Sequence, residues 1–98
     1  MAHNIEIEMK LVGWDKKKEK DYLQQFYGQP ERSLLSKKEL SDFWHYLQSY
    51  HQTTQEMKRL GWTENQGREH LELTYNQRSR ALLSYEQLQE FQEYLQSQ

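Results

Sequence analysis

The sequence of 98 residues contains no cysteine, one proline and four glycines. Without cysteine, the chain has no disulfide to stabilise a small fold and no thiolate to bind a metal. Its longest apolar runs are two or three residues, too short for a transmembrane span or for the apolar part of a signal peptide. We therefore expect a cytoplasmic protein with no membrane segment.

Apolar residues are scarce, at 35%, but they include three Trp, seven Tyr and three Phe. Because large rings bury much surface from few positions, we expect a folded chain despite the polar composition. The net charge of −2 is close to neutral, and no block of basic residues forms a tail. The composition therefore favours a small folded protein without a basic tail.

The clearest feature that is present is an internal repeat. Residues 56–98 match residues 8–50 at a constant offset of 48 positions, without a gap and with 18 identities in 43 positions. Chance agreement at one fixed offset gives only a few identities, so the match indicates an internal duplication. Residues separated by this offset are called counterparts below. Because so short a unit is small for independent folding, we expect both copies to pack pseudo-symmetrically into one small domain, residues 1–98.

Helical periodicity of the apolar residues defines two helices in each copy. Their inward stripes have spacings of three and four, as in Leu40, Phe43 and Leu47. Gly13 and Gly61 suit the left-handed residue that ends a preceding helix. The fold is therefore predicted to be all-α, with tandem duplicated helical-hairpin units. The predicted helices are 16–27, 37–50, 64–75 and 85–97. The other inward positions are Leu23, Phe26, Tyr27, Leu71, Thr74, Tyr75, Leu88, Phe91 and Leu95.

Each predicted helix begins after a residue whose side-chain oxygen can cap it. These caps are Asp15, Ser36, Thr63 and Ser84, and a Glu or Gln follows the last three at capping-box spacing. Two segments stay open. Residues 5–12 alternate in a way that suits a strand, whereas the duplication favours a helix. Residues 50–56 contain neither Pro nor Gly, so either the helix 37–50 continues toward Leu60 or Thr54 opens a short new helix.

The residue types that usually carry catalysis or metal binding show no such arrangement. The four histidines lack ligand spacing, and the serines stand where caps and turns explain them. No glycine-rich phosphate loop occurs. We expect no enzyme activity, no metal and no cofactor. Trp14 and Trp62 recur in both copies, and we expect them to fill the core where one helix passes to the next.

Trp44 and Tyr50 differ from their counterparts, which are Gln92 and Gln98. Apolar bulk that is added to one copy alone has two interpretations. It forms an exposed patch for a partner, or it covers residues 1–12. The sequence favours neither interpretation.

Three arginines in the second copy suggest a contact for an anion or a nucleic acid. Arg68, Arg78 and Arg80 all lie near the start of a predicted helix, where anions bind well. Six acidic residues in the same segment oppose a nucleic-acid surface. Arg80 and its counterpart Arg32 have a structural alternative, because an arginine there could bond the last carbonyls of the preceding helix.

The second copy also resembles a known kind of module. Its pattern runs from Met57-Lys58-Arg59-Leu60-Gly61-Trp62 through Tyr75-Asn76-Gln77-Arg78-Ser79-Arg80 to Leu82-Leu83-Ser84 and Tyr94-Leu95. This pattern is similar to short helical modules of GemA-type phage regulators and of some single-strand annealing proteins. The resemblance implies an accessory role near DNA, with Arg78, Ser79 and Arg80 at the matching positions. The first copy departs from it with Pro30-Glu31-Arg32.

We therefore expect a non-enzymatic helical module that binds another protein or a second copy of itself. The alternative is an accessory nucleic-acid-binding module linked to recombination or to phage-type regulation.

Overall fold

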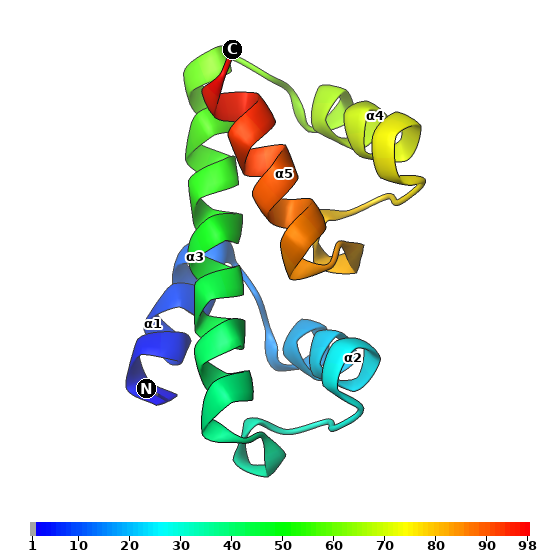
Figure 1. Ribbon diagram of the computed structural model, residues 1–98. Helices are drawn as coiled ribbons and strands as arrows, with labels where there is room; N and C mark the ends of the chain where they lie inside the picture. The colour runs from blue at the N-terminus through cyan, green and yellow to red at the C-terminus, as the bar shows by residue number, and fades with distance from the viewer. Residues whose placement is uncertain (1) are drawn as a thin grey trace. The chain divides into compact units, whose positions relative to one another are not determined.

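The computed structural model describes residues 2–98, and Met1 and the side chains of Ala2 and His3 lie outside this description. The described part forms helices and no strand, which confirms the all-α prediction (Figure 1). The strand alternative for residues 5–12 is therefore wrong. The α-helices are α1 (Ala2–Val12), α2 (Lys16–Tyr27), α3 (Lys37–Leu60), α4 (Glu64–Tyr75) and α5 (Tyr85–Gln96), and the 3-10 turns are η1 (Arg32–Leu34) and η2 (Arg80–Leu82).

Local sequence explains where α1 and α3 end. Gly13 and Gly61 adopt φ values of 75° and 73°, as predicted. After Gly13, the Trp14 amide donates to the Met9 carbonyl at 2.9 Å, and the Trp62 amide donates to the Met57 carbonyl at 2.9 Å in the same way. These six-residue turns are Schellman motifs, in which the residue after glycine packs back onto the last helical turn. The shared Met and Gly-Trp residues of the two copies therefore have a structural role.

The predicted caps are confirmed. Asp15 accepts from the Lys18 amide at 2.8 Å and caps α2. Complete capping boxes open α3, α4 and α5, each with the cap hydroxyl and the side chain three residues later bonding one another's backbone amide. At the other ends of α2 and α4, Gly28 and Asn76 are left-handed, with φ values of 69° and 56°. The residue type differs between the two copies at this position, but both residues adopt the left-handed backbone conformation.

Of the two alternatives for residues 50–56, continuation of the helix is confirmed. Helix α3 runs without a break to Leu60, so the predicted bound at residue 50 is wrong. Thr54 does not open a new helix. The hydroxyls of Thr53 and Thr54 donate back to the Tyr50 carbonyl at 2.7 and 3.2 Å, which is how threonine behaves inside a helix. With neither Gly nor Pro between 50 and 56, nothing interrupts the backbone hydrogen bonds.

The chain divides into two compact units, one ending at Gln48 and the other beginning at Ser49, so the division falls inside α3. The first unit is centred on Tyr22, which the sequence analysis left out of the inward stripe. Its ring centroid lies 4.3 Å from that of Tyr46, 5.5 Å from that of Phe43 and 5.4 Å from that of Trp14. Burial raises the pKa of the Tyr22 hydroxyl above its ordinary value.

The second unit places His70, the counterpart of Tyr22, against α5. The His70 ring stacks on Phe91 and Tyr94, with centroid distances of 5.4 and 4.5 Å. The prediction that Thr74 points inward is wrong, because Thr74 is exposed. In the first unit, its counterpart Phe26 reaches the Tyr22 ring at 4.7 Å, a distance that the shorter threonine does not bridge. The buried apolar residues described in the second unit are Tyr50, Leu71, Leu83, Leu88, Phe91 and Leu95.

Gly67 lies inside α4 at a close approach of two helices. A Cβ atom at this position would lie 3.1 Å from the Met57 sulfur of α3. Glycine costs about 1 kcal/mol relative to alanine inside a helix. A larger residue at this buried position would require the flexible Met57 side chain to shift by a few tenths of an ångström.

The helix bounds of the two units have the same offset as the sequences. Helix α4 begins and ends at the counterparts of the first and last residues of α2. In the same way, η2 covers the counterparts of η1, and α5 begins at the counterpart of the first residue of α3. Helix α1 thereby corresponds to the C-terminal part of α3. The pseudo-symmetric packing of both copies into one domain stays a prediction.

Candidate functional site

Two of the three arginines proposed for anion binding share a pocket. Arg68 of α4 and Arg78 of the following turn line a surface pocket of about 580 Å³, together with Glu72 and Asn76. Both arginine side chains are exposed to solvent. The left-handed Asn76 turns the chain back after α4, so that Arg78 lines the same pocket as Arg68. Two guanidinium groups and one carboxylate therefore share this site.

The third arginine, Arg80, is engaged elsewhere. Its Nη1 donates to the Tyr50 carbonyl at 3.0 Å and to the Thr53 hydroxyl at 2.9 Å, and it also bonds the Thr54 hydroxyl. The guanidinium lies 4.0 Å from the centroid of the Tyr50 ring, a cation–π distance. Arg80 thus anchors η2 to α3 and does not join Arg68 and Arg78.

The bonds that the structure describes for Arg80 and Arg32 reach other groups than the last carbonyls of the preceding helix. After α4, backbone amides already serve these carbonyls: Asn76 donates to Glu72 at 3.0 Å, and Gln77 donates to Leu71 at 3.4 Å. The left-handed turn therefore satisfies the Glu72 and Leu71 carbonyls without an arginine. Arg80 bonds α3 instead, and Arg32 bonds carboxylates of α1 and α2.

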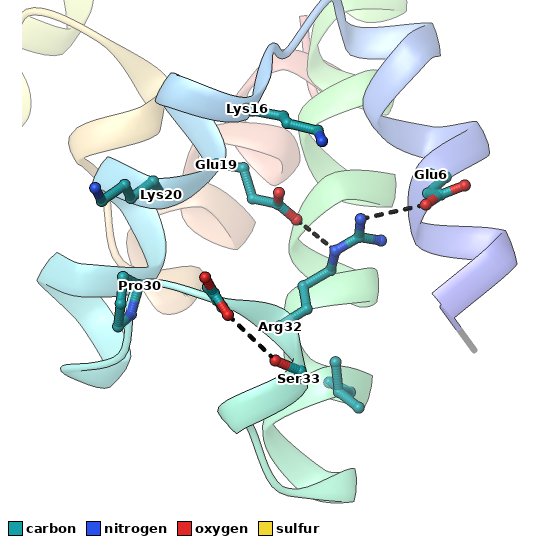
Figure 2. Close-up of a pocket in the computed structure, with 9 residues that line it drawn as sticks. Glu6, Lys16, Glu19, Lys20, Pro30, Arg32 and Ser33 are labelled. Atoms are coloured by element: carbon teal, nitrogen blue, oxygen red, sulfur yellow. Dashed lines mark hydrogen bonds and ion pairs between the residues drawn. The ribbon is translucent and has the colours of Figure 1, made fainter.

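Arg32 of the first unit lines a second pocket, of about 550 Å³ (Figure 2). Its Nε lies 2.6 Å from Glu19 Oε2 and its Nη2 lies 3.4 Å from Glu6 Oε1. Burial raises the pKa of the Glu19 carboxyl, and the nearby charges of Arg32 and Lys16 oppose this rise. Opposite charges are already paired here, so the pocket presents no excess of one sign. Lys16, Lys20, Pro30, Glu31, Ser33 and Leu40 complete its lining.

Of the two interpretations of Trp44 and Tyr50, an exposed patch that contains both rings is not formed. Tyr50 is only 5% exposed and lies under the Arg80 guanidinium. Trp44 is half-buried, with its ring centroid 5.4 Å from that of His45. The two rings lie six residues apart on α3, and a spacing of six places side chains on different faces of a helix. The alternative, that Trp44 covers residues 1–12, stays a prediction.

A different apolar surface, which the sequence analysis missed, lies on α1. Ile5 and Met9 are buried, whereas Ile7 and Leu11 are 46% and 56% exposed. Residues four apart share a helix face, and residues two apart lie on opposite faces. The alternation that suggested a strand could have revealed this arrangement, because on a helix it makes both faces apolar. We call Ile7 and Leu11 the outer face of α1.

The counterparts of this outer face are polar. Gln55 is the counterpart of Ile7, and Arg59 is the counterpart of Leu11. Arg59 is also held in place: its Nε donates to Glu56 Oε2 at 2.7 Å, and its Nη2 donates to the Leu95 carbonyl at 3.0 Å. The second unit therefore has no equivalent apolar surface at these positions.

Side chains that could act as nucleophiles or ligands have structural contacts. Ser36 and Ser84 cap α3 and α5, and the Ser79 hydroxyl accepts from the Ala81 amide at 3.1 Å. Burial lowers the pKa of the stacked His70 ring. Among the described residues, no group of three or more side chains could hold a metal ion.

No family model, curated protein or solved structure matches this chain. The resemblance to GemA-type regulators and to single-strand annealing proteins stays a prediction. In the described part of the chain, every helix is too short or too polar to cross a membrane.

Proposed function

We propose that this protein is a non-enzymatic protein-interaction module and that the outer face of α1 is its contact surface. The observation that carries the proposal is the pair of apolar faces on one helix. Ile5 and Met9 supply the buried face, and Ile7 and Leu11 supply the exposed one. A helix that is apolar on both sides is typical of a helix buried on both sides. A second polypeptide would cover the outer face.

A second copy of the chain suits this face. Glu6 and Lys10 are exposed on α1 beside Ile7, so the apolar residues are flanked by charges of both signs. Glu6 also contacts Arg32 of its own chain at 3.4 Å, but its side chain stays 62% exposed. Two α1 helices packed antiparallel about a two-fold axis would bring Lys10 of each copy toward Glu6 of the other. Such a contact is self-complementary, as a two-fold interface requires.

The proposal is tested by sedimentation equilibrium over a concentration series. We expect the wild type to self-associate. The dissociation constant of the double variant Ile7→Gln, Leu11→Gln should be at least about 100-fold higher, because each buried Ile or Leu contributes about 1.5–3 kcal/mol. The control is Leu73→Gln, which changes an isolated leucine that is 85% exposed and should associate like the wild type. Equal association of all three proteins would overturn the proposal.

We infer, further, that the two units derive from one duplicated helical hairpin. The common offset of the sequences and of the helix bounds supports this inference. Side-chain contacts support it as well, because Arg32 bonds Glu6, and their counterparts Arg80 and Thr54 also bond each other. The outer face of α1 would then be a property that one copy kept or acquired alone.

An accessory nucleic-acid-binding role is the second candidate, and the pocket between Arg68 and Arg78 favours it. Proteins that follow a nucleic-acid strand place several cations along the phosphate backbone. Arg80 is engaged with α3, and Glu72 adds a negative charge to the pocket. These contacts support a site for one anionic group better than a track for a strand. An accessory role in recombination or phage-type regulation and a cytoplasmic location stay predictions.

A further inference from the structure

We propose that the pocket lined by Arg68, Glu72, Asn76 and Arg78 binds one compact dianionic group, such as a phosphate monoester. This site lies in the second unit, and the proposal does not depend on the outer face of α1.

The two arginines of the pocket differ from the other three in the chain. Arg32 pairs with Glu19, Arg59 pairs with Glu56, and Arg80 bonds α3. Arg68 and Arg78 form no hydrogen bond or ion pair with any residue in the described part of the chain. Each guanidinium is a planar fork of donors that fits two oxygens of a phosphate or carboxylate. The N–H donors of these two guanidinium groups are therefore available to a ligand in the pocket.

The backbone brings these donors together in a defined way. Arg68 lies in the first half of α4, and Asn76 ends that helix in the left-handed conformation. This turn places Arg78 on the pocket, and Asn76, whose side-chain amide can also donate, is itself a lining residue. The volume of about 580 Å³ is within the range of pockets that bind small molecules.

The first unit has no equivalent set of donors. The counterparts of Arg68 and Arg78 are Lys20 and Pro30, and the counterpart of Asn76 is Gly28. Only one cation remains at these positions, and proline has no side-chain donor. The first unit therefore supplies an internal control, because Lys20 is also an exposed cation beside a pocket.

Glu72 allows a test in which removing a negative charge and removing a positive charge have opposite effects on anion binding. Its carboxylate lines the same pocket and competes with an anion for the guanidinium groups. Removing this charge should strengthen anion binding, whereas removing an arginine should weaken it. A nonspecific effect of surface charge would not depend on whether the changed residue lines this pocket.

The test is an NMR titration with inorganic phosphate at a pH above about 7, where the dianion is present. We expect saturable shifts of the Arg68 and Arg78 Nε–H signals and of the Asn76 side-chain amide. Arg78→Gln should weaken binding about 10-fold or more, since it removes a charge-assisted hydrogen bond. Glu72→Gln should tighten binding, and Lys20→Gln should leave it unchanged. Shifts that do not saturate, or that are the same in all four proteins, would overturn the proposal.

The source of the dianion is distinguished by two further ligands. A short single-stranded oligonucleotide with a 5′-phosphate is compared with the same oligonucleotide ending in a 5′-hydroxyl. If only the 5′-phosphorylated oligonucleotide binds, and binds more than about 10-fold tighter than inorganic phosphate, the natural dianion is the terminal phosphate of a nucleic acid. If it binds no tighter than inorganic phosphate, the site takes a free phosphate ester. Binding of both oligonucleotides with equal affinity would contradict a site for a terminal phosphate group.

Discussion

Two arginines, two positions apart, have different environments. Arg78 is exposed and lines a pocket, whereas Arg80 is partly buried and holds the Tyr50 carbonyl and two threonine hydroxyls of α3. Arg78 precedes the η2 turn, whereas Arg80 is the first residue of that turn, and their side chains meet different surroundings. The same sequence stretch therefore contains one residue for binding and one for stability.

This difference predicts unequal costs for equal substitutions. Arg80→Gln should lower the free energy of unfolding by about 1–3 kcal/mol, because buried acceptors lose a charged donor and the Tyr50 ring loses its cation. Arg78→Gln should change it by less than about 0.5 kcal/mol, as exposed substitutions usually do. Urea unfolding of both variants measures the difference. Similar costs for the two variants would show that the Arg80 contacts contribute little to stability.

At the scale of single helices, α4 packs on α5 through an ionisable ring. His70 stacks on Phe91 and Tyr94 at the place where the first unit has Tyr22. Burial lowers the pKa of His70, so its ring binds a proton more weakly in the folded protein than in the unfolded chain. The protein should therefore lose stability from this residue as the pH falls below the unfolded histidine value of about 6.5.

His70→Tyr should remove this loss and keep the ring contact, because tyrosine occupies the same place in the first unit. Urea unfolding at a pH above and a pH below about 6.5 gives the loss for each protein. The raised pKa of Glu19 acts in the opposite direction at acid pH, since the folded protein then holds a proton more firmly. That contribution is common to both proteins and cancels in the comparison. An equal loss of stability in the variant would mean that His70 is not the source.

Caps and helix ends could be predicted from the sequence because they depend on neighbouring residues. Ser84 with Gln87, and Asn76 at a left-handed end, need only residues within one turn. The contacts of Tyr50 and Arg80 could not be predicted in this way, because they join residues 30 positions apart. The apolar periodicity likewise did not place Tyr22 in the core, because its burial depends on contacts with the rings of Phe43 and Tyr46 from another helix.

The candidate site was predictable in part. Arg68 and Arg78 were singled out by their charge, and the turn at Asn76 brings them to one pocket. Glu72 was counted only as a charge that opposes binding, whereas its place on the pocket lining gives it a specific effect. The outer face of α1 was missed because the alternation was weighed only as a sign of a strand, and was not placed on the helix that the duplication favours for residues 5–12. On a helix, the same alternation exposes every second apolar residue.

At the scale of the whole molecule, two units with the same order of elements differ in what they leave exposed. The second unit has polar counterparts where the first has Ile7 and Leu11, and it has two unpaired arginines where the first has Lys20 and Pro30. We therefore propose a protein contact for the first unit and an anion contact for the second. Centrally, we propose that a second copy of the chain covers the outer face of α1.

The solvent accessibility of the α1 methyl groups tests this claim most directly. In a methyl NMR experiment with a water-soluble paramagnetic agent, Ile5 should be protected and Leu73 accessible at every protein concentration, because the first is buried and the second is exposed. As the concentration rises through the range of self-association, we expect the methyl groups of Ile7 and Leu11 to change from accessible to protected. If they stay as accessible as in dilute solution while Ile5 stays protected, a second copy does not cover this face and the central claim is contradicted.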